Sequence, residues 1–357
     1  MKEIGSEYHY EKLSKKGNKT WQGIVDMQDE TFVFSGRTAI ETVLLNLPHI
    51  RKAILPSYCC DSMIEPFRKA GINFIFYEVN FHNGLDIQVD IPEDIDLLLW
   101  CNYFGFRVKM PDFTDFIDRG GIILEDITHS FFSQNVYNSQ SQYVVASLRK
   151  WGPLLCGGYC ATKGEYLKYK PTLLPLQEFL EQKKRAMRLK YNYIYEIEDI
   201  DKNIFLNDFS ESNKWIAKNY SQLAIDEETK NIFTKLDWQE VSEVRKRNAK
   251  VLYTGLKDIS SIKFLYKEKD MDCPLFVPIL VESGMRNSLR RTLTENSIYC
   301  PIHWPKPSES CVSNLYEMEL SLICDQRYDE NDMKRIVEVI SRWDDTKIEV
   351  KEKNINE

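Results

Sequence analysis

Short apolar runs and amphipathic stretches alternate along the chain between residues 31 and 165. Apolar runs of this kind, rich in Val, Ile, Leu and Phe, predict strands that are buried on both faces. The expected strands are 31–36, 52–56, 73–79, 94–105, 121–126 and 143–148, and the expected helices are 38–47, 61–71 and 112–120. Strands that alternate with helices form a largely parallel sheet, so the sequence predicts an α/β fold.

The second half of the chain has a different pattern. Residues 172–200 are helical in pattern, residues 207–222 are polar and predict a loop, and a long helix is expected over 237–259. Short strands and helices then predict a small α+β unit. We therefore expect four parts, which are an N-terminal arm (1–30), a large α/β domain (31–225), a small C-terminal α+β domain (226–345) and a polar tail (346–357).

Composition narrows the class of protein. The 357 residues carry a net charge of −7, which argues against a general binder of nucleic acid or of anionic membranes. The nine cysteines lack the paired spacing of a metal site and predict free thiols in a reducing compartment. No apolar run approaches the length of a membrane span, and we expect a cytoplasmic protein that uses no metal.

Polar residues stand at the ends of three predicted strands. The turn Ser35-Gly36-Arg37-Thr38 opens a helix, where backbone N–H groups can hold a phosphate, although Ser and Thr are also ordinary helix caps. Glu125-Asp126 ends the strand at 121–126, and Ser147-x-x-Lys150 ends the strand at 143–148. In a parallel sheet these ends lie at one edge, which is where ligands bind.

Each of these residue types suits the chemistry of pyridoxal 5′-phosphate (PLP). A lysine amine forms a Schiff base with the cofactor, and burial beside positive charge lowers its pKa so that the free amine can react. An aspartate beside the pyridine nitrogen keeps that nitrogen protonated. The Ser35–Thr38 turn and Ser147 provide donors for the phosphate. A phosphate turn, an acid and a lysine at three strand ends of one sheet together indicate a PLP site much more specifically than any one of these features alone.

The same segments carry a resemblance to a known family. The stretch "FSGRTAIETVLLNL" resembles the phosphate turn, "GGIILEDITHSFF" the acidic strand end, and "SLRKWGPLLCGGYCAT" the lysine segment of the DegT/DnrJ/EryC1/StrS sugar aminotransferases. These are fold-type I PLP enzymes, and the resemblance covers about residues 30 to 340. It implies a large domain with a mostly parallel sheet covered by helices, and a small C-terminal α+β domain.

The resemblance also implies roles for individual residues. Lys150 becomes the Schiff-base lysine, Asp126 the partner of the pyridinium, and His129 the contact to the phenolic oxygen of the cofactor. The implied phosphate contacts are Ser35, Gly36, Arg37, Thr38 and Ser147. Cys59-Cys60 stands where that family has the aromatic residue that stacks on the cofactor ring, which leaves Tyr58 as the nearest aromatic candidate, and Asn102 replaces the usual His. His303, Trp304 and Arg327 are candidates for substrate contact.

The implied reaction is amino transfer. An amino acid, with glutamate expected, would donate the amino group to a keto sugar linked to a nucleotide, for surface polysaccharide or amino-sugar biosynthesis. The resemblance further implies a homodimer with a shared active site, and we place the subunit contact at residues 172–200, 207–222 and near 100–105. Two alternatives stay open: a PLP enzyme acting on a small keto or amino acid, and a catalytically degenerate fold-type I protein that only binds a partner or ligand.

Overall fold

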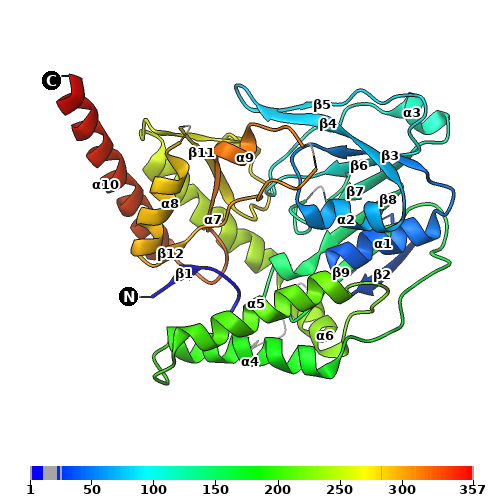
Figure 1. Ribbon diagram of the computed structural model, residues 1–357, viewed down its shortest axis with the longest axis horizontal. Helices are drawn as coiled ribbons and strands as arrows, with labels where there is room; N and C mark the ends of the chain where they lie inside the picture. The colour runs from blue at the N-terminus through cyan, green and yellow to red at the C-terminus, as the bar shows by residue number, and fades with distance from the viewer. Residues whose placement is uncertain are drawn as a thin grey trace.

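An eight-stranded sheet forms the centre of the molecule in the computed structural model, which describes residues 2–10, 22–24, 26–134, 136–282, 284–309 and 311–355 (Figure 1). Its order is β2-β9-β8-β7-β6-β3-β4-β5. The strands are β2 (Asp29–Val33), β3 (Lys52–Pro56), β4 (Asn73–Phe81), β5 (Leu85–Gln88), β6 (Leu97–Cys101), β7 (Ile122–Asp126), β8 (Tyr143–Ser147) and β9 (Gly158–Thr162). Part of the expected N-terminal arm, residues 11–21, lies outside the described residues.

The middle of this sheet is parallel, as the sequence predicted. Strands β4, β3, β6, β7 and β8 run in one direction, while β9 is antiparallel to both of its neighbours and β5 forms an antiparallel edge. All five residues of β6 are buried, because helices and loops cover both faces of a parallel sheet. The intervening helices are α1 (Gly36–Asn46), α2 (Asp61–Lys69) and α3 (Thr114–Asp118).

Two long helices, α4 (Gln177–Ile194) and α5 (Lys202–Asn219), pack against each other along one side of the sheet (Figure 1). Helix α5 corrects the loop that we expected at 207–222. Asp201 caps its start by accepting a hydrogen bond from the N–H of Asn203. Phe205, Phe209 and Ile216 follow at helical spacing and are buried. Two of the polar residues between them, Asp208 and Ser212, are buried as well, and the number of polar residues hid the helical pattern.

A smaller unit packs beside the sheet. It contains the three-stranded sheet β10-β11-β13, formed by Ile262–Phe264, Val277–Val281 and Glu319–Leu322. Its helices are α7 (Trp238–Leu256), α8 (Arg286–Glu295), α9 (Leu315–Met318) and α10 (Glu330–Ile355), and α10 continues through most of the expected tail. Helix α6 (Glu227–Lys235) belongs with the large sheet, since Phe233 packs against Phe131. We therefore propose a domain boundary near residue 236 in place of 225.

Residues 3–10 cross from the small unit to helix α4, and we call them the N-terminal strap. Strand β1 (Ile4–Gly5) pairs in parallel with β12 (Ile298–Tyr299) of the small unit. At the other side, the buried ammonium of Lys190 in α4 donates to the carbonyls of Gly5 and Glu7, at 3.4 Å and 2.5 Å. The strap therefore ties the two units together.

The segment from Trp100 to Gly105, where we expected part of a subunit contact, is inside the chain. Trp100, Tyr103 and Phe104 are each 1% exposed or less. These side chains therefore offer no surface to a second subunit. Among the residues that the structure describes, no helix combines the length and the apolar character needed to cross a bilayer.

Candidate active site

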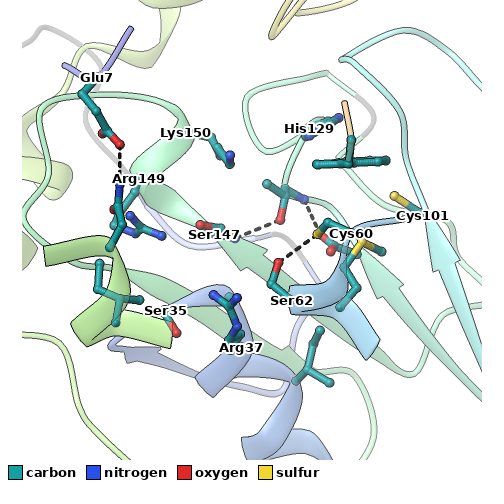
Figure 2. Close-up of a pocket in the computed structure, with 18 residues that line it drawn as sticks. Glu7, Ser35, Arg37, Cys60, Ser62, Cys101, His129, Ser147, Arg149 and Lys150 are labelled. Atoms are coloured by element: carbon teal, nitrogen blue, oxygen red, sulfur yellow. Dashed lines mark hydrogen bonds between the residues drawn. The ribbon is translucent and has the colours of Figure 1, made fainter. Parts of the chain in front are cut away.

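A cavity of about 360 Å³ lies beyond the carboxyl ends of the parallel strands. Because β2, β3, β6, β7 and β8 all end at this edge, residues far apart in the sequence meet in it. Nine of the residues predicted from the sequence line it: Ser35, Gly36, Arg37, Cys60, Asp126, His129, Ser147, Lys150 and Trp304. Figure 2 shows how most of these side chains surround one space.

The start of helix α1 forms one end of the cavity. Ser35 caps the helix, and its Oγ accepts a hydrogen bond of 3.2 Å from the N–H of Thr38. Gly36 is needed for close packing, because a Cβ at this position would stand 3.0 Å from the Cβ of Ser147. Thr38 does not line the cavity, since its hydroxyl donates to the carbonyl of Tyr220 at 2.8 Å. Ser35 uses the N–H of Thr38, so Gly36 and Arg37, which line the cavity, are the positions where this helix start can bind an anion.

Asp126 enters the cavity from the end of β7. Its Oδ1 accepts a hydrogen bond of 2.8 Å from the N–H of Thr128. The Thr128 hydroxyl in turn accepts one of 2.9 Å from the N–H of Ser147, so the two strand ends are fixed to each other. Burial raises the pKa of Asp126, and the bond from Thr128 and the charge of Lys150 partly oppose this rise. Such a carboxyl group suits contact with a cationic ring nitrogen.

Lys150 ends a short 3₁₀ turn, Leu148–Lys150, that follows β8. The residue is exposed and lines both this cavity and a second one beside it, while the protein around its amine partly desolvates it. This desolvation lowers the pKa of Lys150, and the neighbouring charge of Arg149 lowers it further. A lowered pKa increases the fraction of the nucleophilic free amine at neutral pH.

His129 is a neutral side chain at the far end of the cavity. Burial, followed by the charge of Lys150, lowers its pKa to about 3. Its Nδ1 accepts a hydrogen bond of 3.0 Å from the backbone N–H of Phe104, so the proton of the neutral ring is on Nε2. The Trp304 ring stacks on this imidazole, with 5.6 Å between the centroids. His129 can therefore donate one hydrogen bond to a ligand.

Two residues expected near the cofactor ring do not line this cavity. Tyr58 is completely buried and packs against Tyr316 and Trp304. Asn102 faces a different cavity, where it donates to Glu125 at 2.7 Å and to Ser130 at 3.0 Å. Both side chains already have partners inside the chain, so the structure argues against direct contact between either of them and a ligand at Lys150.

A second cavity of about 430 Å³ shares Glu7, Arg149 and Lys150 with the first. His303 and Arg327 line this second cavity and not the first. Arg327 forms a bidentate ion pair with Asp325, at 2.9 Å and 2.8 Å, and donates to carbonyls of the strap. This arrangement argues against Arg327 as the group that binds a donor carboxylate, because its N–H groups are already used.

Several lining residues were missed by sequence reasoning. Arg149 stands beside Lys150, and the adjacent positive charge was a signal that we did not use. Thr128 lies inside the quoted acidic stretch, between Asp126 and His129. Glu7 comes from the strap, and no local pattern indicates that residue 7 reaches a site formed by residues 35–150. Across the described residues, no group of three His, Cys, Asp or Glu side chains could hold a metal ion.

Comparison with known proteins places the fold. No family model and no curated protein matches the chain. Among solved structures, it is similar to DesI, determined in the presence of its TDP-sugar product, with a TM-score of 0.63, 12% identity, and coverage of 92% of this chain and 83% of that chain. It is also similar to PseC of Helicobacter pylori, an aminotransferase involved in the biosynthesis of pseudoaminic acid. The TM-score is 0.62 and the sequence identity 14%, and the match covers 97% of this chain and 100% of that chain.

A third similar structure bears the name of the family that the sequence resembles. It is a DegT/DnrJ/EryC1/StrS aminotransferase from Brucella abortus, with a TM-score of 0.58, 16% identity, and coverage of 89% of this chain and 86% of that chain. At these identities the comparison establishes the fold. The chain therefore has the fold-type I architecture of the DegT/DnrJ/EryC1/StrS-type sugar aminotransferases, as its sequence predicted.

Proposed function

We propose that this protein is a PLP-dependent aminotransferase that moves an amino group from an amino acid, with glutamate expected, to a keto sugar linked to a nucleotide. One observation carries the proposal. A lysine whose pKa is lowered, a buried aspartate and the start of helix α1 meet in a single cavity at the carboxyl edge of the sheet. PLP has an aldehyde, a ring nitrogen and a phosphate, which match these three groups.

The residues present fit the cofactor. At the phosphate end, Gly36 and Arg37 begin helix α1, and Ser35 and Ser147 stand beside them. The cavity volume of about 360 Å³ lies within the range of small-molecule sites. Cys60 and Met63 supply apolar contact from the β3–α2 side, where the sequence offered no aromatic ring.

When bound, PLP supplies an aldehyde that condenses with amines and a ring that accepts electrons. Lys150 provides the amine that holds the cofactor and afterwards moves a proton at the substrate carbon. Asp126 holds the proton on the ring nitrogen, and Thr128 fixes the direction of its carboxylate. His129 donates from Nε2 to an oxygen of the ligand. Trp304 closes the wall behind His129 and keeps water from this side.

The second cavity is the place that we propose for the amino-acid donor. It opens onto Lys150 and contains Arg290, whose Nε donates to the carbonyl of Cys300 at 3.3 Å and leaves the NH₂ groups for a ligand. A nucleotide-linked sugar as the acceptor is supported by DesI, the similar structure determined with its TDP-sugar product. A small keto acid as the acceptor is the second candidate, because a cavity of about 430 Å³ with arginines suits such a molecule.

We further propose a homodimer whose contact lies around helices α4 and α5. The segment before α4 exposes Leu173, Leu174 and Leu176 to 64%, 64% and 60%. Ile197 between the helices and Ile204 in α5 are also about half exposed or more, at 57% and 49%. A run of exposed apolar side chains is typical of an interface.

The experiment that tests the function is a product analysis. The protein is incubated with PLP, glutamate and a panel of nucleotide-linked keto sugars, and the products are identified by mass spectrometry. We expect the mass of one sugar to change as its keto group is converted into an amino group. We also expect glutamate to be converted into 2-oxoglutarate. A parallel panel of keto acids without sugars tests the second candidate. Absence of amino transfer in both panels, with PLP bound, would contradict an aminotransferase.

A further inference from the structure

The phosphate end of the cavity contains two arginines from the same chain. Arg37 is the second residue of helix α1, and Arg149 lies in the 3₁₀ turn after β8. In the view of Figure 2, both side chains lie near Ser35 and Ser147, at the end of the cavity away from His129 and Cys101. The helix start of α1 opens into the same space.

Arg37 is fixed from outside the cavity by an acidic residue. Its Nε donates to Oε2 of Glu65 in helix α2 at 2.7 Å, and the two side chains are only 19% and 28% exposed. This bond uses Nε and leaves the two NH₂ groups of the guanidinium for a ligand. Because Glu65 already orients the guanidinium, little side-chain entropy is lost when its two NH₂ groups bind an oxyanion.

Arg149 lacks a comparable partner. Its Nε–H is buried and has no hydrogen-bond partner among the described residues. The acidic residue whose charge acts on Arg149 is Glu7 of the strap, which contacts Lys183 at 3.5 Å and accepts a hydrogen bond from Asn213 at 2.9 Å. Burial, and then the charge of Arg37, lowers the pKa of Arg149, while Glu7 opposes this effect. The guanidinium therefore occupies a position that an additional anion would stabilise.

The charges in the cavity do not balance. Arg37, Arg149 and Lys150 line it together with two acids, Glu7 and Asp126, while His129 is neutral. Of these two acids, Asp126 lies at the end of β7, and Glu7 already forms an ion pair with Lys183, so neither acid is paired with the two arginines. Desolvated like charges repel, and a doubly charged phosphate ester is the ligand that removes this repulsion.

We infer that Arg37 and Arg149 form a guanidinium clamp that binds the phosphate of the cofactor from two sides, with Glu65 behind the first arginine and Glu7 behind the second. The clamp adds two charge-assisted contacts to the helix N-terminus, and both come from the subunit that carries Lys150. The inference rests on the proposed function, because it takes PLP as the ligand. Glu65 acts through Arg37 and is a positioning residue.

The test compares PLP with pyridoxal, which lacks the phosphate, on Arg149→Gln, Arg37→Gln and the double variant. Dissociation constants are measured by absorbance titration, and inorganic phosphate is used as a competitor. We expect each substitution to weaken PLP binding about 10- to 100-fold, since charge-assisted hydrogen bonds are lost. Pyridoxal binding should change less than threefold or so, and inorganic phosphate should compete poorly in the double variant.

Matched variants keep the result interpretable. Arg291→Gln removes an exposed arginine of helix α8 and should leave both ligands unaffected. Glu65→Gln should lower the ratio of PLP to pyridoxal affinity, a readout that loss of packing alone would not change. If Arg149→Gln does not fold, Arg149→Lys replaces it and should retain part of the preference for PLP.

The outcomes separate the clamp from the function. If PLP and pyridoxal never attach to Lys150 in the unaltered protein, the proposed function fails. If PLP attaches but the arginine variants bind it as tightly as before, the clamp is refuted. The clamp is also refuted if a nucleoside diphosphate, and not PLP, loses affinity in the variants, because the arginines then serve the substrate.

Discussion

Glu125 and Asp126 are consecutive in strand β7, and their side chains serve opposite faces of the sheet. Asp126 lines the cavity with Lys150. Glu125 faces the other side, where it accepts hydrogen bonds from Asn102, Ser141 and the N–H of Asn138. Successive residues of a strand point in opposite directions, so only the second acid can take part in chemistry at the lysine.

The two acids provide a matched comparison. We expect Asp126→Asn to lower turnover by several orders of magnitude, because an amide cannot hold the proton on the ring nitrogen. Cofactor affinity should fall moderately, by the roughly 1.5–3 kcal/mol of one charge-assisted hydrogen bond. Glu125→Gln should leave turnover within about tenfold, since burial raises the pKa of Glu125 to about 7 and the neutral form is tolerated. Steady-state kinetics measure turnover in both variants. If turnover falls equally in Asp126→Asn and Glu125→Gln, Asp126 has no special role in the reaction.

Lys150 should carry the covalent label. Reduction of the PLP-loaded protein with borohydride should attach a pyridoxyl group to Lys150, and Lys150→Ala should lose both the label and turnover. Lys168, whose side chain is 85% exposed, serves as the control, and Lys168→Ala should keep both. Peptide mapping by mass spectrometry makes the measurement. A label on another lysine in the unaltered protein would contradict the assignment.

His129 should act without changing its charge. Because its pKa is about 3, the imidazole is neutral above pH 5, and the pH profile of kcat/KM should show no step from it between pH 5 and 9. His129→Gln preserves a donor and should keep turnover within about tenfold, while His129→Ala loses a hydrogen bond of about 1 kcal/mol. A step near pH 6.5 that disappears in His129→Gln would show that the imidazole titrates.

The exposed leucines before α4 should control assembly. Leu174→Asp places a charge in the proposed contact and should shift the protein toward monomer, with lower cofactor occupancy if the site is shared. Ile75→Asp is the control, since Ile75 is 36% exposed on strand β4, away from this segment. Light scattering after gel filtration measures the mass. A fully active monomer of the unaltered protein would exclude a shared site.

The buried lysine beneath the strap should make stability depend on pH. Burial, and then the charge of Arg327, lowers the pKa of Lys190 from 10.5 to about 7. Between pH 7 and 10.5 the unfolded chain therefore binds a proton that the folded chain does not, and stability rises with pH. Denaturant unfolding at pH 7.5 and 9.5 should show this rise, and Lys190→Met should flatten it.

The exposed Lys218 gives the comparison for that measurement. Lys218→Met should leave the difference in unfolding free energy between the two pH values as it is in the unaltered protein. A rise of the same size in Lys190→Met would show that other groups produce the pH dependence.

The sheet and the residues at its carboxyl edge were accessible from the sequence, because both depend on local patterns. Apolar runs such as 97–101 mark buried strands; Asp126 is the last residue of strand β7, and Lys150 ends the short turn that follows β8. Helix α5 was hidden because two residues of its buried face, Asp208 and Ser212, are polar. A pattern that is read from apolar residues alone does not register such positions.

The remaining parts of the site depend on contacts between distant segments. Glu7 reaches the cavity only because Lys190 and Arg327 fix the strap, and residue spacing carries no record of those bonds. Asn102 follows the buried strand β6, at the same edge where Asp126 ends β7, yet its side chain bonds with Glu125 on the other side of the sheet. Strand position identifies the edge of the sheet but does not identify the face.

The strap has a consequence for the order in which the chain folds. Residues 3–10 are synthesised long before their partners, which are Lys190 in α4, Ile298 in β12 and Arg327. A segment that is synthesised before the large sheet is therefore able to dock only after that sheet is complete. The large sheet can form during translation, while Glu7 takes its place in the cavity wall only after residues 298 and 327 have been made.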